Sequence, residues 1–338
     1  MQIIPKKSST FEVPKNWGDA DAPDSIKIAM EQPVYHIPAL LNETLEGLAV
    51  KADGTYVDVT YGGGGHSRAI LERLGPKGRL VGMDQDMDAW ENRLDDSRFT
   101  FAHGNFVYLK NFMRYYGIDG VDGILADLGV SFHHFDAVER GFTFRADAPL
   151  DMRMNRSASF TAQELLNTYS EERLADVLHL YGELRQSRRM AAAIVKARPL
   201  STTGQLVEAV ESLLKPAQMK KELSMLFQAL RIEVNGELDA LRRLLTQSQD
   251  LLNPGGRLAI ITYHSLEDRL VKNFMRTGNV EGKLEKDFFG RVNTPWRVVT
   301  SKVIVPSAEE VERNPRSRSA KLRVAELIAT PERDKNRQ

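Results

Sequence analysis

One stretch of the chain, residues 55–84, constrains the fold more than any other. Residues 55–60 contain Tyr and Val side chains that favour a buried β-strand, and four consecutive glycines, Gly62 to Gly65, follow. Residues 67–74 are good helix formers with apolar side chains at helical spacing, and a second apolar strand ends on Asp84. This order of strand, glycine turn, helix, strand and acid is the arrangement that holds a nucleoside-bearing cofactor.

Two classes of cofactor fit such a unit, and the position of the acid does not separate them. Asp84 lies 22 positions after Gly62, close to the spacing of about 20 found in dinucleotide folds. The glycine pattern is more informative, because Ser67 stands where the third glycine of G-x-G-x-x-G would fall, beside the bulky His66. S-adenosylmethionine has no pyrophosphate and does not require that glycine. The pattern therefore favours a methyltransferase over a nicotinamide-dependent oxidoreductase.

The alternation of strands and helices continues and then stops. Two more strands are predicted, and the second of them, residues 121–127, ends on Asp127. Residues 133–235 have helical spacing without a convincing strand, and capping boxes begin helices at Thr161 and Thr202. We therefore expect an α/β fold: a Rossmann-like methyltransferase sheet with an inserted all-helical subdomain.

The α/β pattern then resumes towards the C-terminus. A further strand is predicted at residues 257–262, and the β-rich stretches 298–305 and 321–328 are expected to close the sheet as an antiparallel pair. The predicted parts of the chain are a flexible N-terminal extension, residues 1–33; the methyltransferase domain, residues 34–132 and 236–330; and the inserted helical subdomain, residues 133–235.

Composition excludes several kinds of site. The absence of cysteine removes disulfides, thiolate metal sites and cysteine nucleophiles. No stretch approaches the roughly 18 apolar residues of a membrane span, so no membrane contact is expected. The 46 basic and 46 acidic side chains give a net charge of zero, so any nucleic-acid contact must come from local basic clusters. The cluster at residues 313–323 is the stronger candidate for phosphate contacts.

Candidate site residues follow from the expected strand ends, since ligands of open α/β sheets bind beyond the carboxyl ends of the strands. This rule nominates the glycine turn up to His66, Asp84, Asp127, and the Tyr263-His264-Ser265 segment. Phe106 is placed to lie against an adenine ring, with a core aromatic as the alternative. For His264, the alternative to a direct role in the site is a purely structural one. The histidines match no zinc spacing, so no metal site is predicted.

Several motifs, taken in order, resemble one family over about residues 36–328. They include Gly62-Gly63-Gly64-Gly65-His66-Ser67, Asp127-Leu128-Gly129-Val130-Ser131, Glu139-Arg140-Gly141-Phe142, His264-Ser265-Leu266-Glu267-Asp268-Arg269 and Asn314-Pro315-Arg316-Ser317-Arg318-Ser319. On these motifs the chain resembles the MraW family, the ribosomal RNA small subunit methyltransferase H family. The resemblance implies a cytoplasmic enzyme that uses S-adenosylmethionine to methylate N4 of a cytidine in the decoding centre (P site) of 16S rRNA.

The resemblance also implies a set of site residues. The family's cofactor contacts fall on Gly64, Gly65, His66, Asp84, Phe106 and Asp127. A further contact, a glutamine in the family, falls on His134, whose imidazole can also form hydrogen bonds. Asp127 is expected on the cofactor side and remains a third catalytic candidate beside Tyr263 and His264, which are expected near the target base.

The expected partner is 16S rRNA within the small ribosomal subunit, because the target base must leave its stack and the helical insertion is suited to clamp RNA. A homodimer is left open beside a monomer. The alternatives are a DNA amino-methyltransferase, the oxidoreductase considered above, and a non-catalytic ribosome-assembly factor that keeps the cofactor as a structural ligand.

Overall fold

The computed structural model describes residues 38–129, 137–286, 288–290 and 292–328. All of them belong to one compact unit, residues 37–338. The predicted extension at residues 1–33 lies outside the described residues, and so does His134.

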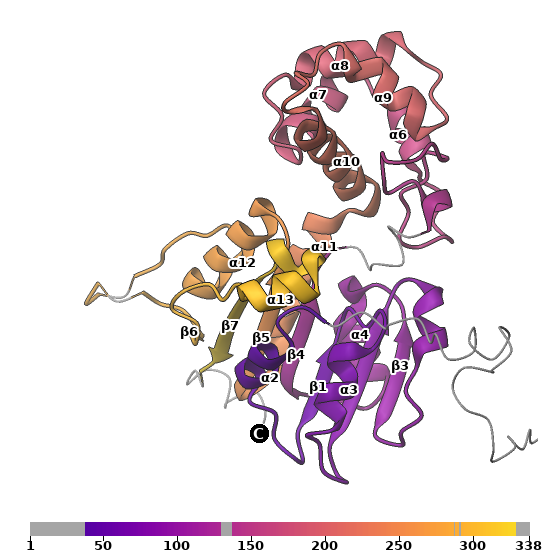
Figure 1. Cartoon of the computed structure of the whole chain (residues 1–338). Coiled ribbons are helices and arrows are strands. Elements are labelled where there is room, and N and C mark those ends of the chain that lie inside the picture. Colours follow the sequence, from indigo (N-terminus) through magenta and orange to yellow (C-terminus); the bar gives the residue numbers. More distant parts are fainter. Residues whose placement is uncertain (1–37, 130–136, 287, 291, 329–338) are drawn as a thin grey trace, which may run out of the picture. The chain divides into compact units, whose positions relative to one another are not determined.

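In the described residues, seven strands form one mixed sheet in the order β3-β2-β1-β4-β5-β7-β6 (Figure 1). The strands are β1 (Thr55–Asp58), β2 (Arg79–Asp84), β3 (Phe99–His103), β4 (Val121–Asp127), β5 (Leu252–Thr262), β6 (Trp296–Val298) and β7 (Lys321–Leu327). The pairings among β1 to β5 are parallel, whereas β7 is antiparallel to both β5 and β6. The strand order reverses between β1 and β4, which is where open α/β sheets bind their ligands.

Helices cover both faces of this sheet, because successive strand residues point to opposite sides. One face packs Tyr56 and Leu125 against α2 (Leu41–Leu48) and α3 (Gly65–Leu71). The other face packs the alternate strand residues against three further helices. Those helices are α4 (Leu109–Tyr115), α11 (Glu237–Leu251) and α12 (Ser265–Thr277). A short helical turn, η1 (Met87–Asn92), follows β2, and another, η2 (Phe106–Tyr108), follows β3.

Between β4 and α11, the described residues from 137 onward are mainly helical and have a hydrophobic core of their own. Its elements are η3 (Val138–Arg140), α6 (Ala162–Thr168), α7 (Glu171–Leu180), α8 (Ser187–Lys196), α9 (Thr203–Glu211) and α10 (Met219–Asn235). Both predicted capping boxes are present: Thr161 caps α6 together with Glu164, and Thr202 caps α9 together with Gln205. The prediction of a helical insertion in an α/β sheet is thus confirmed.

The predicted strand at residues 298–305 is wrong in extent. On the side of β7 away from β5, the paired strand is β6, which ends at Val298. Only an isolated bridge from Ile304 to Leu322 follows it. The N–H groups of both Val299 and Thr300 donate to the carbonyl oxygen of Val324, so the register breaks there. Further along, α13 (Ala308–Arg313) and η4 (Pro315–Ser319) lead into β7. No helix in the described part of the chain is long and apolar enough to cross a membrane.

The separate core of the helical insertion predicts a contrast within one helix. Leu178 of α7 is fully buried in that core, whereas Leu180 of the same helix is 58% exposed. We expect Leu178→Ala to lower the free energy of unfolding by about 2–5 kcal/mol, and Leu180→Ala to change it by less than about 0.5 kcal/mol. Urea unfolding of the two variants measures the difference. Equal losses would contradict the assignment of this core.

Candidate functional site

The ends of β1 and β4 are tied together by one side chain. The N–H of Asp127 donates to the Thr60 hydroxyl oxygen over 2.6 Å, and the N–H of Thr60 donates to the Asp58 carboxyl over 3.2 Å. The N–H of Val59 continues the pairing by donating to the Leu125 carbonyl oxygen at 2.9 Å. As a result, the carboxyl groups of Asp58 and Asp127 lie at the same edge of the sheet, at the point where the strand order reverses.

The glycine turn follows immediately and requires glycine for steric reasons. Gly62 and Gly64 have φ values of +50° and +72°, a region that other residues rarely adopt. A Cβ on Gly64 would lie 2.6 Å from the Tyr61 hydroxyl oxygen, and one on Gly65 would lie 2.8 Å from Pro38 Cγ. The Tyr61 and Pro38 side chains therefore occupy the space that a Cβ would need, which is why glycine is required at these two positions.

Asp84 at the end of β2 holds this turn in place. One of its carboxyl oxygens accepts a hydrogen bond from the N–H of Gly62 and the other accepts one from the N–H of Asp86, each over 2.8 Å. A carboxylate is an acceptor-only group, the type that binds ribose hydroxyls at this position of a nucleoside-binding unit. Phe106 follows the neighbouring strand β3 and is partly buried against the core of the sheet. Asp84 and Phe106 thus lie beyond adjacent strand ends.

His66 lies on the other side of the turn and is buried. Its Nε2 is 3.1 Å from the carbonyl oxygen of Ala39, so Nε2 carries the proton and donates it to that carbonyl. Burial lowers the pKa of His66 to about 4, so the imidazole is neutral at pH 7. The unprotonated Nδ1 lies 3.7 Å from Asp127 Oδ2. His66 therefore adds no positive charge to the site.

Two carboxyl groups in the middle of the site have raised pKa values. Burial raises the pKa of Asp58 to about 6, against the opposing hydrogen bonds from Ser67 and Thr60. Burial, together with the nearby carboxylates of Asp58 and Glu267, raises the pKa of Asp127 to about 7, against the opposing hydrogen bond from Tyr263. The donors to these two side chains are hydroxyl and N–H groups, all of them neutral. A positively charged ligand would stabilise both carboxylates, whereas a pyrophosphate would be repelled.

Asp58 was missed by the sequence reasoning. The first strand was predicted to extend to residue 60, which placed Asp58 inside the strand instead of at its end. In the structure β1 ends at Asp58. The signal was present, because this acid ends an apolar strand just as Asp84 and Asp127 do.

Tyr263 joins Asp127 from the end of β5. Its hydroxyl donates to Asp127 Oδ1 over 2.8 Å. Burial, together with the negative charge of Asp127, raises the pKa of Tyr263 well above 10, so the phenol stays protonated. Since its hydrogen is directed at Asp127, the phenol oxygen offers its lone pairs as acceptors. Of the sequence candidates near the base, Tyr263 is the one that contacts Asp127.

His264 takes part in a different set of contacts. Its side chain is buried, with Nε2 lying 3.1 Å from Glu267 Oε1, and both ring nitrogens are shielded from solvent. Glu237 lies close enough for ligand atoms of the three residues to hold a metal ion, all within 4.8 Å of one another. However, Arg231 donates to both carboxyl oxygens of Glu237, over 2.9 and 2.8 Å, and already supplies a positive charge. The structure does not bring the His264 ring nitrogens to Asp127.

A second residue whose role the sequence did not reveal is Arg140, which lies in the Glu139-Arg140-Gly141-Phe142 motif. Its side chain is almost wholly buried, and its guanidinium donates to Asp86 over 3.2 Å and to Asp88 over 3.4 Å. It also donates to the carbonyl oxygens of Arg153 and Met154 over 2.9 and 3.1 Å. Arg140 thus connects the segment before α6 to the loop after β2, which carries Asp84.

The basic cluster at residues 313–323 is only partly available for phosphate contacts. Arg323 donates to the Asp268 carboxyl over 2.7 and 3.2 Å and is largely buried, so the expectation for this residue was wrong. Arg313, Arg316 and Arg318 remain exposed. Arg323 is largely buried because it lies on the antiparallel strand β7, which places it beside Asp268 at the start of α12.

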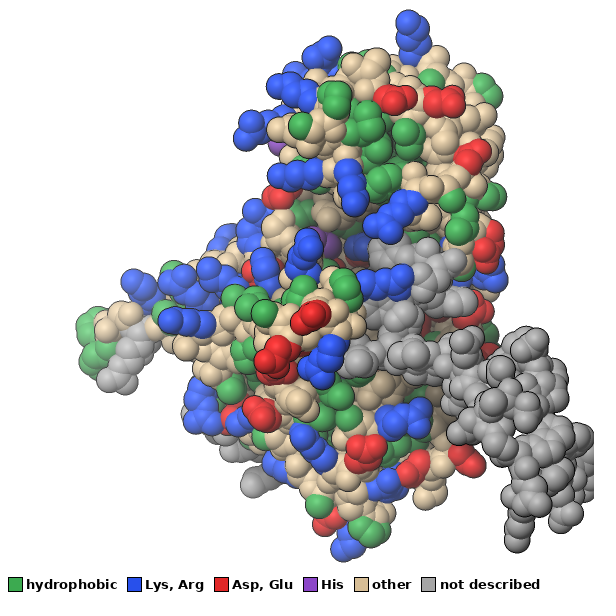
Figure 2. Space-filling view, in the orientation of Figure 1, with side chains coloured by type: hydrophobic (Ala, Val, Ile, Leu, Met, Phe, Trp, Pro, Cys, Tyr) green, Lys and Arg blue, Asp and Glu red, His purple; other side chains and the backbone are tan. Residues whose placement is uncertain are grey.

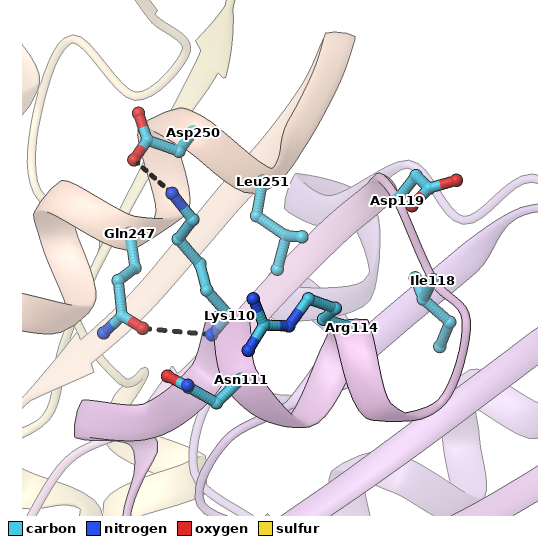
Figure 3. A pocket seen from close by; sticks show the side chains of 8 residues that line it. All are labelled: Lys110, Asn111, Arg114, Ile118, Asp119, Gln247, Asp250 and Leu251. Carbon is cyan, nitrogen blue, oxygen red and sulfur yellow. Dashed lines mark hydrogen bonds and ion pairs between the residues drawn. The ribbon is translucent and has the colours of Figure 1, made fainter.

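A pocket of about 430 Å³ lies away from these residues, between α4 and α11 (Figure 3). Across it, Lys110 pairs with Asp250 over 2.9 Å and its N–H donates to the Gln247 side chain over 3.0 Å. None of the residues at the strand ends lines this pocket. Lys110 and Asp250 pair with each other across the pocket, and we assign it no ligand.

Comparison with known proteins gives a consistent result. The profile of the MraW methylase family matches residues 33–328. A protein of Bacteroides thetaiotaomicron named "Ribosomal RNA small subunit methyltransferase H" is 60% identical over 295 residues, covering 86% of this chain and 97% of that protein. Proteins of the same name from Bacteroides fragilis and Porphyromonas gingivalis are 59% and 56% identical. Each alignment covers 88% of this chain and 98% of the relative.

Arg140 gives the first prediction from this geometry. Arg140→Ala removes the guanidinium from buried carboxyl and carbonyl groups, so we expect a loss of about 3–5 kcal/mol in the free energy of unfolding. Arg140→Lys retains the charge but not the planar fork, and should recover only part of that loss. As a control, Arg242→Ala removes an exposed pair with Asp239 and should change stability by less than about 1 kcal/mol. Urea unfolding measures all three variants, and an Arg140→Ala loss no larger than that of the control would contradict the connecting role.

Asp127 gives a prediction about pH. Its folded-state pKa of about 7 lies above the value of about 3.9 in an unfolded chain. The folded state therefore binds more protons between these values, and this group's contribution to stability is lost as pH rises through about 7. Asp127→Asn removes that loss and keeps an oxygen that accepts from Tyr263. The variant should gain stability relative to the unsubstituted protein between pH 5 and about pH 8; parallel thermal-unfolding curves would contradict the raised pKa.

Proposed function

The chain belongs to the MraW methylase family, and we propose that it methylates N4 of a cytidine in the decoding centre of 16S rRNA, using S-adenosylmethionine. The relatives carry the name of a small-subunit rRNA methyltransferase, which supports the substrate class. The observation that carries the cofactor assignment is the pair of buried carboxyl groups, Asp58 and Asp127, with neutral donors. S-adenosylmethionine is a cation at its sulfonium sulfur and at its amino group, and a nicotinamide dinucleotide has an anionic pyrophosphate instead.

The residues at the strand ends fit this cofactor chemically. Asp84 ends the second strand, where an acid binds the ribose hydroxyls in nucleoside-binding folds, and the partly buried Phe106 offers an aromatic face to the adenine. Gly64 and Gly65 let Tyr61 and Pro38 pack directly against the turn, which fixes its shape, and His66 closes the turn without adding charge. When bound, the cofactor supplies a methyl group already activated by the sulfonium charge. The protein's remaining task is to position the acceptor and remove its proton.

We assign the removal of the N4 proton to Tyr263 and Asp127. The N4 amino group is a poor nucleophile because its lone pair is delocalised, and a hydrogen-bond acceptor for its hydrogens localises that pair. The Tyr263 oxygen is such an acceptor, because its own hydrogen points at Asp127. As the N4 hydrogen moves to the phenol oxygen, the phenol hydrogen moves to Asp127 Oδ1. The pKa of about 7 lets this carboxyl take up the proton and release it to water.

His264 is assigned a positioning role. The Glu267 carboxyl lies beside His264 and also accepts from the N–H of Tyr263 over 3.0 Å. Arg231 and Glu237 hold the same cluster from the end of α10 and the start of α11. These contacts fix the backbone that presents Tyr263.

We further propose that the helical insertion recognises the RNA around the target. It meets the sheet at the α10–α11 junction, where Ile232, Leu238 and Leu266 form a small buried cluster. At its other end Arg140 contacts the loop after β2. RNA bound to the insertion is thereby linked to both sides of the cofactor site. Deletion of residues 137–235 without loss of RNA affinity would contradict this assignment.

Tyr263→Phe tests the proton assignment. The variant keeps the ring and loses the hydroxyl that contacts Asp127, so we expect a fall in kcat of about 10²-fold, with little change in the affinity for S-adenosylhomocysteine. Turnover is measured by transfer of labelled methyl groups to small subunits from cells that lack this protein. Tyr115→Phe, at an exposed position on α4, is the matched control. Normal turnover of Tyr263→Phe would remove the phenol from the mechanism.

The target itself is tested by mass spectrometry of 16S rRNA from cells that lack the protein. We expect one cytidine in the decoding centre to lose an N4 methyl group, and the purified protein to restore it. Methyl transfer to DNA instead would favour the DNA amino-methyltransferase, and the absence of any transfer would favour the assembly factor.

A further inference from the structure

In the segment that joins α12 to β6, the described residues 279–286 and 292–294 form the two arms of a hairpin, with residues 288–290 at its tip. Asn279 fixes its base, because its side chain accepts from the N–H of Lys283 and donates to the carbonyl oxygen of the same residue. The two arms pair through a bridge between Lys286 and Val292, and the N–H of Asn293 donates to the Glu285 carbonyl oxygen over 2.8 Å. Figure 1 shows this orange segment extending beyond the end of α12.

The tip of the hairpin carries two exposed aromatic side chains. Phe288 is 99% exposed and Phe289 is 80% exposed, with their rings edge to face at 5.6 Å. Leu284 and Val292 nearby are also exposed. Single exposed apolar residues are common on protein surfaces, whereas a cluster of this kind marks an interaction site. Neither phenylalanine packs into a core that would explain its presence.

The surroundings of the tip are basic. Residues 272–302 contain seven Lys and Arg and three Asp and Glu, a net charge of +4 in a chain whose total is zero. Lys272, Arg276, Lys283, Lys286 and Lys302 are exposed. Figure 2 shows blue Lys and Arg side chains along this segment, up to the green tip. An apolar tip alone would suit many protein partners, but its combination with positive charge selects a polyanion that has faces for stacking.

We propose that the hairpin is an RNA-contact surface, where Phe288 and Phe289 stack on unpaired bases and Lys283 and Lys286 contact phosphates. This combination of aromatic platforms and cations is how proteins bind single-stranded nucleic acid. The proposal rests on the proposed function, which makes rRNA the substrate. The 13 residues of α12 separate the hairpin from Tyr263, a distance of about 20 Å at 1.5 Å per residue. The hairpin therefore extends the RNA footprint beyond the target base.

Removal of the aromatic rings is the first arm of the test. The double variant Phe288→Ser/Phe289→Ser loses side chains that are 99% and 80% exposed, so its unfolding midpoint and its affinity for S-adenosylhomocysteine should not change. Its KM for small subunits should rise about tenfold or more, because base stacking on each ring is lost, while kcat stays the same. Tyr115→Ser, which removes an aromatic that is 82% exposed on α4, is the matched control and should leave KM unchanged.

Charge reversal is the second arm. Binding of the full chain to protein-free 16S rRNA is measured against salt concentration. Lys283→Glu/Lys286→Glu should reduce the slope of log K against log salt by about 1 to 2, since each phosphate contact contributes roughly 0.7. The control Lys77→Glu/Arg79→Glu makes the same change in charge at exposed positions around the start of β2, at the other end of that strand from Asp84. It should leave the slope unchanged.

The outcomes distinguish this inference from the proposed function. If the unsubstituted protein methylates rRNA and both hairpin variants match their controls, the hairpin proposal is overturned and the proposed function stands. A defect seen with assembled subunits but not with protein-free RNA would overturn it in favour of a ribosomal protein. A shift from dimer to monomer on sedimentation of the phenylalanine variant would overturn it in favour of a second copy of the chain. Failure of the unsubstituted protein to methylate rRNA would count against the proposed function itself.

Discussion

The carboxyl groups of Asp58 and Asp127 lie at adjacent strand ends in the middle of the sheet, and their hydrogen-bond donors carry no charge. Burial of two such groups is unfavourable when both are ionised, which is why their pKa values are raised. A protein keeps such a pair when a ligand supplies the missing positive charge. The glycine turn, the neutral His66 and the backbone-bound Asp84 are arranged around this requirement.

The rest of the fold connects that site to its surroundings. Arg140 ties the start of the helical insertion to the loop that follows Asp84. At the other end, Asn235 of α10 accepts from the N–H of Met154 and donates to the carbonyl oxygen of Met152, so both ends of the insertion hold one loop. Contacts at the insertion are thereby coupled to the cofactor-side loops through a few buried polar groups. Such groups are sensitive to substitution, because each one satisfies several partners at once.

Local patterns predicted most of the sheet, because its parallel strands are short apolar runs and several end on an acid. The antiparallel pairing at the edge of the sheet was predicted, but its extent was not: β6 ends at Val298, where two N–H groups share the carbonyl oxygen of Val324. The same limit applies to the site. The strand-end rule nominated Asp84 and Asp127, but the orientation of His264 depends on Glu267 and on the Arg231–Glu237 pair, which joins α10 to α11. The role of Arg140 depends on Asp86, which lies 54 positions earlier in the sequence.

Calorimetry tests directly whether this pair of buried carboxyl groups selects a cationic cofactor. S-adenosylmethionine is titrated into the protein at about pH 6.5 in buffers that differ in ionisation enthalpy, with a nicotinamide dinucleotide titrated in parallel. A bound cation lowers the pKa of both carboxyl groups, so the account predicts tight binding with release of protons to the buffer. Binding without proton release, or binding of the dinucleotide in place of S-adenosylmethionine, would contradict it.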